Sequence, residues 1–556
     1  MNDLGIVRSE LLFGKVNAIS ANSVQFEFTN INHQATYFEG RRYGKGEVGE
    51  FIIIESQVNL ILGRIVEIKK DDLELSNLEI VGRIQLLGSI QMDTLKVTAG
   101  VDYYPNINDL IYSAPHNFIA DIPSRMNLNS PNIELEIGSI DLDQDCSIKV
   151  TPEKLFGRHL GILGATGSGK SNTTARILEE CLKHNSKVIL LDPTGEYKDF
   201  INDSVLNVYL NNPKSISKSS IATKLSIEAF IETDFIALFE PSGKVQGPKF
   251  KEAIRSLRLV QLLQKDTSHT FPISNGIFQK IEQYESTFIS AINHVQGTKL
   301  IEHPSTPFDP LKLCKQIKQE CVWPPNNNGI WKEDNNSFSY CLALISRING
   351  ITTSSTFEFI FGNNGLPNLT EKIEEFYQSD KKLLRIDLSD IGFEFRAREI
   401  VANVIGRFFL NKARKNELVN KPIVLFLDEA HNFIGKTIGN EDTLAKLDAF
   451  ELIAKEGRKF GLNICLATQR PRDITEGVLS QLGTLIVHRL TNDRDREIVE
   501  RACGEIDKAA SDFLPSLQPG EAVIIGNDFP IPLTINIKKP TIKPNSEGAN
   551  FQENWA

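Results

Sequence analysis

The stretch RHLGILGATGSGKS, residues 158–171, decides the fold of this chain. It reads as a short apolar strand at residues 159–163, then a glycine-rich turn, then a helix that begins near Lys170. The turn matches the pattern G-x-x-x-x-G-K-[ST] in full. Glycines there let several backbone N–H groups point at one phosphate, and the helix dipole adds positive potential. The pattern therefore predicts a nucleoside triphosphate site, in which Lys170 reaches the β and γ phosphates and Ser171 holds Mg²⁺. The predicted nucleotide-binding residues are Gly164, Ala165, Thr166, Gly167, Ser168, Gly169, Lys170, Ser171 and Asn172.

The length, composition and net charge of the chain exclude several classes of protein. The 556 residues have room for about three to four domains. No apolar run long enough to span a membrane and no signal peptide occurs, so we expect no membrane association. The seven cysteines form no C-x-x-C pair, which fits the reducing cytoplasm and predicts neither a disulfide framework nor a zinc site. The net charge of −10 neither supports nor excludes DNA, because a ring can be acidic outside and basic along its channel.

Strand and helix patterns divide the chain into five parts. Short strands with glycine turns predict a small barrel or sandwich over residues 1–115, with a structural or docking role. About seven apolar strands alternating with helices predict an α/β domain with a mostly parallel sheet, in two pieces at residues 116–209 and 376–540. Between them, residues 210–375 turn helical and form an insertion. Residues 541–556 are a polar tail that we expect to be mobile.

Two patterns within the insertion lead to further expectations. Residues 277–292 and 250–257 each keep apolar side chains on one helical face. Basic residues cluster at its start, and each alone is best explained as part of a solvated helix face. As a group they suggest a channel lining: Lys214, Lys218, Lys244, Lys249, Lys251, Arg255 and Arg258.

The segment IVLFLDEAHNF, residues 423–433, supplies the acidic strand end that a P-loop ATPase needs. Five apolar residues lead to Asp428 and Glu429. We expect Asp428 to hold Mg²⁺ and Glu429 to act as the general base for the attacking water. This pair favours hydrolysis over phosphoryl transfer to a small molecule, the reaction of a nucleoside kinase.

Four other residues are candidates at strand or helix ends. Asp192 and Glu196 follow the apolar strand at residues 188–191, where either a nucleotide contact or a simple Asp/Pro/Gly turn would explain them. Gln469 follows the strand at residues 462–468 and could touch the γ phosphate or its water. Arg458 precedes that strand and could enter a neighbouring subunit's site, although a surface arginine is the default explanation.

In its motifs the chain resembles the HerA family of the FtsK–HerA superfamily of hexameric DNA-pumping ATPases. The resemblance rests on segments that recur in family order: LGATGSGKSN (163–172), LLDPTGEY (190–197), LFLDEAHNF (425–433), EGRKFGLNICLATQRP (456–471), VLSQLGTLIVHRLTNDRDRE (478–497) and LQPGEAVIIG (517–526). It implies a RecA-like ATPase core behind an N-terminal barrel, a homohexameric ring, and ATP and Mg²⁺ as cofactors. It further implies that Gln469 is a γ-phosphate sensor, Arg458 a trans arginine finger and Arg158 an additional cis arginine.

The resemblance also implies a pathway. Such proteins work with a nuclease in DNA-end processing or with a nuclease or NAD-degrading effector in anti-phage defence. We therefore expect a cytoplasmic double-stranded-DNA translocase that feeds or activates a partner docked on the N-terminal barrel. The alternative is an ATP-dependent ring scaffold that activates an effector while DNA pumping is incidental.

Overall fold

The structure is a computed structural model in two compact units, Met1–Ser186 with Asn463–Ala556, and Lys187–Leu462. It describes all residues except 1–4, 30–34, 58, 72–78, 126–132, 142, 212–218, 265–269, 296–297, 363–364, 439–443, 504–510, 512, 547–554 and 556.

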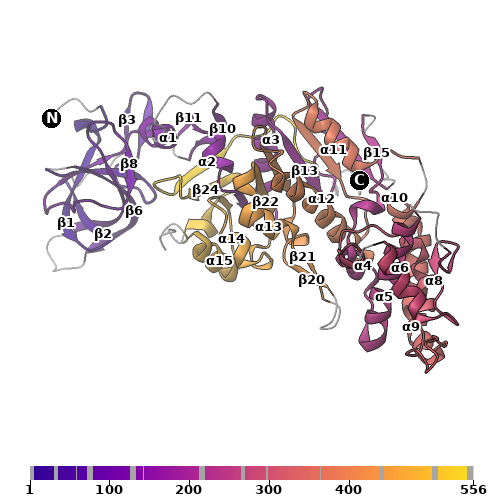
Figure 1. Cartoon of the computed structure of the whole chain (residues 1–556). Helices are drawn as coiled ribbons and strands as arrows, with labels where there is room; N and C mark the ends of the chain where they lie inside the picture. The colour runs from indigo at the N-terminus through magenta and orange to yellow at the C-terminus, as the bar shows by residue number, and fades with distance from the viewer. Residues whose placement is uncertain are drawn as a thin grey trace. The chain divides into compact units, whose positions relative to one another are not determined.

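The first unit begins with a closed antiparallel barrel, drawn in indigo and violet in Figure 1. Six strands follow one another around it, and pairing of the β2 and β7 strands closes the ring. Isoleucines and phenylalanines that alternate along these strands fill its interior, including Phe26, Ile52 and Ile84. A Cβ at Gly82 would lie 2.3 Å from the Phe26 ring, so the glycine lets two strands approach over that ring. The predicted N-terminal barrel is confirmed. In ring order its strands are β2 (Ser23–Phe28), β1 (Leu12–Ile19), β9 (Leu110–Ser113), β5 (Phe51–Glu55), β6 (Leu60–Asp71) and β7 (Glu79–Ile90).

Two small additions accompany the barrel. The strand β8 (Val97–Ala99) pairs antiparallel with β7, and β3 (Thr36–Phe38) and β4 (Arg41–Tyr43) form a hairpin.

The rest of the first unit is a mixed sheet. Its strand β12 (Leu160–Leu163) runs parallel to β22 (Leu462–Thr468) and to β23 (Thr484–His488). Beyond β23 the pairing is antiparallel, in the order β24 (Glu521–Gly526), β25 (Leu533–Ile537), β10 (Leu135–Ile140), β11 (Asp143–Val150). Residues 522–525, one of the apolar strands from which the mostly parallel sheet was expected, are therefore antiparallel to their neighbours. The chain leaves β23 and enters β24 at the same edge, since Gly520 donates a hydrogen bond to the P-loop residue Ser168.

The helices of this unit are α1 (His116–Arg125), α2 (Pro152–Phe156), α3 (Lys170–Leu182), α14 (Glu476–Leu479) and α15 (Asp493–Cys503).

The second unit contains five parallel strands with buried, β-branched and leucine-rich sequences. In sheet order they are β19 (Ile423–Leu427), β13 (Val188–Asp192), β18 (Leu383–Asp387), β14 (Val205–Leu210) and β15 (Ile221–Thr223). The parallel sheet predicted from alternating strands and helices is confirmed. Two helices, α12 (Ala397–Arg414) and α13 (Ala449–Glu456), accompany these strands, together with a hairpin of β20 (Lys436–Ile438) and β21 (Ala445–Leu447).

The insertion is largely helical, and α6, α8 and α9 lie around α5 in Figure 1. One predicted helical face fails, because residues 277–278 form a strand of a short hairpin and the helix starts only at Glu285. Asn275 and Gly276, both left-handed, form the turn of that hairpin, and the left-handed Glu282 (φ 61°) interrupts the helix that the apolar spacing suggested. The elements are α4 (Glu232–Phe239), α5 (Gly243–Leu263), β16 (Ile273–Ser274), β17 (Ile277–Phe278), α6 (Glu285–His294), α7 (Thr298–Glu302), α8 (Leu313–Glu320), α9 (Asn335–Thr353), α10 (Glu358–Phe361) and α11 (Leu369–Gln378).

Among the described residues, no helix has the length and apolar character needed to cross a membrane.

Candidate nucleotide site

The predicted P-loop lies between β12 and α3 in the first unit. Gly167 (φ 74°) and Gly169 (φ 115°) adopt left-handed conformations, which is the freedom that the motif's glycines supply. Gly169 is the N-cap of α3, so the unpaired N–H groups of the first helical turn open toward the loop. The Lys170 ammonium folds back and donates a hydrogen bond to the Ala165 carbonyl at 3.3 Å. The loop is thus already curled around the position where a phosphate would replace that carbonyl contact.

Gln469 lies against this loop, and its role as a γ-phosphate sensor stays a prediction. It follows β22, which is a direct parallel neighbour of β12, so both strands end at the same edge of the sheet. The Thr166 hydroxyl donates a short hydrogen bond to Oε1 of Gln469. An amide side chain in this position can form hydrogen bonds with a phosphate bound in the P-loop or with the water beside it.

His488, at the end of β23, also supports the loop, and the sequence reading assigned it no role. Its ring is fully buried, and this burial lowers the pKa of His488 to about 4, so the imidazole is neutral. Nδ1 lies 2.8 Å from the Glu521 carbonyl and Nε2 lies 2.8 Å from the Thr173 hydroxyl on α3. The sequence did hold a sign of this role, because His488 ends an otherwise apolar strand in the segment IVHRL.

The predicted acidic pair lies in the second unit, at the end of β19. Asp428 is buried and its amide donates to the Leu191 carbonyl on β13 at 3.3 Å. Glu429 adopts a left-handed conformation (φ 46°), and its buried Oε2 lies 3.2 Å from Nδ1 of His431. Such a backbone is costly for a residue other than glycine, and this strain is typical of functional turns.

Four acidic side chains, those of Asp192, Glu196, Asp428 and Glu429, influence one another's charge and would be stabilised by a divalent cation. Burial, and then the charges of Asp192, Glu196 and Glu429, raise the pKa of Asp428 well above its usual value. Without a positive charge, this carboxylate therefore favours its protonated form. Mg²⁺ prefers carboxylate and water oxygens, so the donor set fits it. Among the described residues, no group of three or more side chains is arranged as a complete metal site.

Asp192 has a well-defined structural environment. Its carboxylate accepts hydrogen bonds from the amides of Gly195 (2.7 Å) and Tyr197 (3.1 Å), which form the turn after β13. It also pairs with the buried Arg385 at 2.7 Å, and Arg385 in turn bonds Asp387 at 2.8 Å. The simple-turn explanation accounts for these contacts, while a nucleotide role for Asp192 and Glu196 stays a prediction. Sequence reasoning missed Arg385, although an arginine within the apolar strand LLRIDL was its signal.

The two candidate arginines lie at strand beginnings. The Arg158 carbonyl accepts a hydrogen bond from Gly483 before β12 starts, whereas the P-loop follows the end of β12. Arg458 is exposed and lies just before Gly461, whose carbonyl bonds the first residue of β19, whereas Glu429 follows the end of β19. A five-residue strand such as β19 spans about 16 Å, which exceeds the reach of the Arg458 side chain. The catalytic roles of Arg458 and Arg158 stay predictions.

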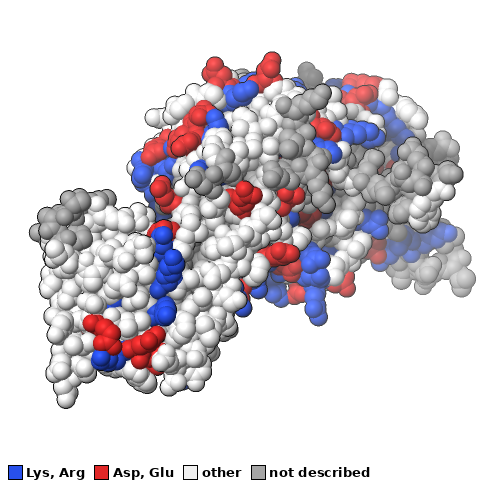
Figure 2. Space-filling model, turned by 90° about the vertical axis from the view of Figure 1, so that its right-hand side faces the viewer, with Lys and Arg blue, Asp and Glu red and all other residues white. Residues whose placement is uncertain are grey.

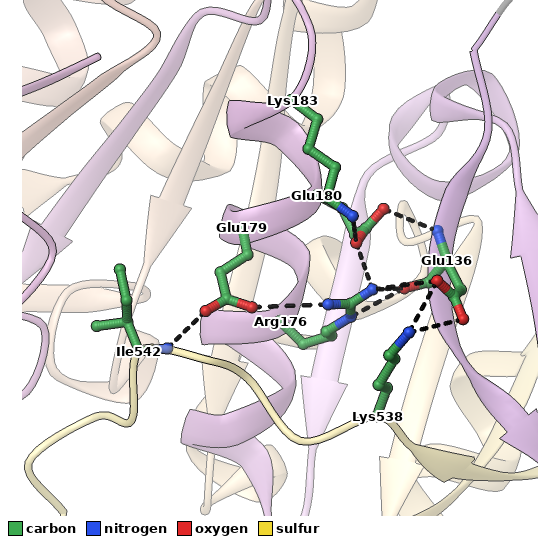
Figure 3. Close-up of polar contacts among 7 residues, drawn as sticks. All are labelled: Glu136, Arg176, Glu179, Glu180, Lys183, Lys538 and Ile542. Atoms are coloured by element: carbon green, nitrogen blue, oxygen red, sulfur yellow. Dashed lines mark hydrogen bonds and ion pairs between the residues drawn. The ribbon is translucent and has the colours of Figure 1, made fainter. Parts of the chain in front are cut away.

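The other end of α3 is anchored by a buried ionic network (Figure 3). The Arg176 guanidinium donates two hydrogen bonds to the Glu136 carbonyl of β10, at 2.7 and 2.9 Å, and pairs with Glu179 and Glu180. Glu179 in turn accepts a bond from the Ile542 amide at 2.6 Å. Residue 542, which the sequence placed in a mobile tail, is thus tied to the P-loop helix, while most of that tail lies outside the described residues.

The basic residues at the start of the insertion are mainly occupied within their own unit. Arg258 is buried against Glu232 and three backbone carbonyls, and Arg255 pairs with Glu302. Lys249 pairs with Glu252. Lys214 and Lys218 lie outside the described residues. On the face drawn in Figure 2, basic and acidic side chains are interspersed and large areas carry neither.

Comparison with known proteins identifies the family. The central-domain model of helicase HerA matches residues 135–409, and the HerA-like C-terminal model matches residues 415–524. The probable helicase MJECL08 of Methanocaldococcus jannaschii is 23% identical over 92% of this chain and 94% of its own length. The DNA double-strand break repair helicase HerA of Saccharolobus solfataricus is 24% identical over 88% and 87%. The solved structure of VirB4 of Thermoanaerobacter pseudethanolicus has a TM-score of 0.43 at 15% identity, covering 76% of this chain and 98% of that one. Both family models and the motif series agree, and the chain belongs to the HerA family of P-loop ATPases.

Proposed function

We propose that this chain is the subunit of a homohexameric motor that hydrolyses ATP to move along double-stranded DNA and feeds or activates a partner enzyme. The observation that carries the proposal is the contact between Thr166 and Gln469, which joins the P-loop to a residue able to sense the γ phosphate. Curated HerA relatives are described as DNA double-strand break repair helicases, which supports DNA as the substrate.

In the proposed mechanism, the P-loop amides and Lys170 bind the β and γ phosphates. Ser171 and Asp428 would hold Mg²⁺, and the ion would supply positive charge that offsets the phosphate charge. Glu429 accepts a proton from the attacking water, and Gln469 orients that water. Arg458 acts on the site of a neighbouring subunit, since it lies at the strand end opposite to Glu429 of its own unit. Arg158 is the additional cis arginine that the family resemblance implies.

A ring-shaped arrangement also accommodates the charge. The chain carries a net charge of −10, and basic and acidic side chains are interspersed on the face of Figure 2. That face therefore offers no broad basic surface for DNA. DNA would instead be gripped inside the ring. The barrel offers a module separate from the ATPase sheet on which a nuclease or an NAD-degrading effector could dock, in DNA-end processing or anti-phage defence in the cytoplasm.

ATPase assays with and without linear duplex DNA test the proposal. We expect DNA to stimulate hydrolysis by the wild type, and Glu429→Gln to retain ATP and stay bound to DNA as a ring in native mass spectrometry. Hydrolysis that is indifferent to duplex DNA, together with a Glu429→Gln variant that binds no DNA, would reject the motor and leave an ATP-dependent scaffold for an effector enzyme.

A further inference from the structure

We propose that His488 is a positioning residue that holds the P-loop in its nucleotide-binding shape before ATP arrives. This inference rests on the P-loop being the ATP site. The contacts of His488 with Thr173 and with the Glu521 carbonyl would affect the affinity for ATP and leave the rate of hydrolysis unchanged.

The first observation is the set of hydrogen bonds that the imidazole makes. The Glu521 carbonyl can only accept, so Nδ1 of the neutral ring carries the proton and donates it. Nε2 then has only a lone pair, so the Thr173 hydroxyl proton is shared between this nitrogen at 2.8 Å and the Gly169 carbonyl of the same helical turn at 3.2 Å. The ring therefore joins the P-loop helix to the start of β24.

The second observation is the packing of the ring against the loop itself. A Cβ at Gly164 would lie 2.6 Å from Cβ of His488, and one at Gly169 would lie 3.3 Å from Cε1. Both glycines of the P-loop pattern thus lie directly against this side chain. The imidazole fills the space beneath the turn that the glycines leave open.

The third observation is a backbone contact from the same neighbouring segment. Residues 517–521 turn beside the loop, and the Gly520 amide donates to the Ser168 carbonyl at 3.0 Å. The adjoining Glu521 carbonyl holds His488. One segment thus fixes the P-loop both directly, through Ser168, and through the histidine.

These contacts matter for binding because an empty P-loop aims several N–H groups at one point with no phosphate to satisfy them. Apparent affinity falls in proportion to the fraction of molecules in the competent shape. The Thr173–His488 hydrogen bond is buried and biases the loop toward that shape. Loss of one such bond predicts an increase of about 3- to 10-fold in the Kd for ATP.

The chain offers a matched pair of variants. Thr173→Val keeps the side-chain shape and removes the hydroxyl that contacts His488 and the Gly169 carbonyl, so the His488 variants and the double variant separate the two contacts. Thr174→Val makes the same change at the next position, where the buried hydroxyl has no hydrogen-bond partner among the described residues. His488→Asn keeps a donor near the Nδ1 position but is too short to reach Thr173, whereas His488→Gln can present an acceptor near the Nε2 position.

The test uses the full-length protein, with a fluorescent ATP analogue for Kd and steady-state hydrolysis for KM and kcat. We expect Thr173→Val and His488→Asn to raise Kd and KM about 3- to 10-fold with kcat within about twofold of wild type. Thr174→Val should match wild type, His488→Gln should recover most of the affinity, and the Thr173→Val/His488→Asn double variant should be no weaker than either single variant.

Equal affinities of Thr173→Val and Thr174→Val would overturn the positioning role, as would a loss confined to kcat. Multiplying effects in the double variant would likewise show that the two residues act separately. Failure of the wild type to bind the analogue is a different outcome, because it would reject the proposed ATP site itself and with it this inference.

Discussion

The hydroxyl of Thr166 in the P-loop donates a hydrogen bond to Oε1 of Gln469 at the end of the neighbouring strand β22. The two residues are 303 positions apart in sequence and meet because β12 and β22 are parallel neighbours. With Thr166 donating to its oxygen, the Gln469 amide group keeps its NH₂ donors for a phosphate or a water.

Gln469→Ala should therefore lower kcat while leaving ATP binding near normal. Loss of one positioned polar contact to the reacting groups typically costs about 100-fold or more in rate. Steady-state hydrolysis and analogue binding measure the two effects separately. Arg472→Ala, an exposed position in the turn that follows Gln469, is the control and should behave as wild type. A Gln469→Ala enzyme with normal kcat would remove Gln469 from the reaction.

Arg458 should act only on a neighbouring subunit. Arg458→Ala is expected to bind ATP and to lose about 10³-fold or more in hydrolysis, since an arginine finger contributes on that scale. Mixing it with Lys170→Ala subunits should restore part of the activity, because some interfaces then combine an intact P-loop with an intact arginine. Lys459→Ala is the adjacent exposed control. Mixed rings that stay inactive would contradict a trans role.

Local sequence patterns predicted the strands and the turn that carry the candidate site residues. They predicted the direction in which neighbouring strands pair less well. The apolar strands before Gly164 and Asp428 and the glycine-rich turn are local features, and all lie where the sequence placed them. The antiparallel direction of β24 lies in its pairing with β23, where His488 is opposite Ala522, and no local signal within residues 521–526 carried that pairing.

The residues that sequence reasoning missed share a physical reason. His488 and Arg385 are polar side chains within otherwise apolar strands, and each is buried by partners from distant segments. A sequence shows that such a residue is unusual but not which groups satisfy it. The spacing of residues 277–292 suggested one helix, but the left-handed Glu282 interrupts that stretch and the helix starts only at Glu285.

His488 should give the protein an acid-sensitive stability. Its pKa of about 4 in the fold lies below the ordinary 6.5, so the unfolded chain gains a proton at a pH where the folded chain does not. Its contribution to stability is complete above pH 6.5 and is lost as the pH falls toward 4. Between pH 6.5 and 5 this amounts to about 2 kcal/mol.

Melting temperatures of wild type and His488→Gln from pH 7 to pH 5 measure this contribution. The wild type should lose more of its Tm over this range than the variant, because glutamine does not titrate. His303→Gln, at an exposed histidine, should keep the wild-type slope. Parallel Tm profiles for wild type and His488→Gln would show that the imidazole is not held neutral by the fold.

Arg176 and Lys183 offer a direct comparison of a buried and an exposed ion pair to the same carboxylate (Figure 3). Both cations contact Glu180, but the Arg176 side chain is 6% exposed and that of Lys183 is 56% exposed. Arg176→Ala leaves the Glu180 carboxylate without its buried partner and frees the Glu136 carbonyl, so we expect a loss of about 3–5 kcal/mol. Lys183→Ala should cost no more than about 1 kcal/mol, since solvent screens an exposed pair.

Urea unfolding of both variants, followed by circular dichroism, measures the difference. Arg176→Lys should fall between them, because an ammonium cannot reproduce the fork in which two guanidinium nitrogens donate to the one backbone carbonyl oxygen of Glu136. Equal midpoints for Arg176→Ala and Lys183→Ala would mean that Glu180 finds solvent or another cation when Arg176 is lost. The network would then not be the anchor of the P-loop helix, and the contacts of His488 at the other end of α3 would be the main support of the loop.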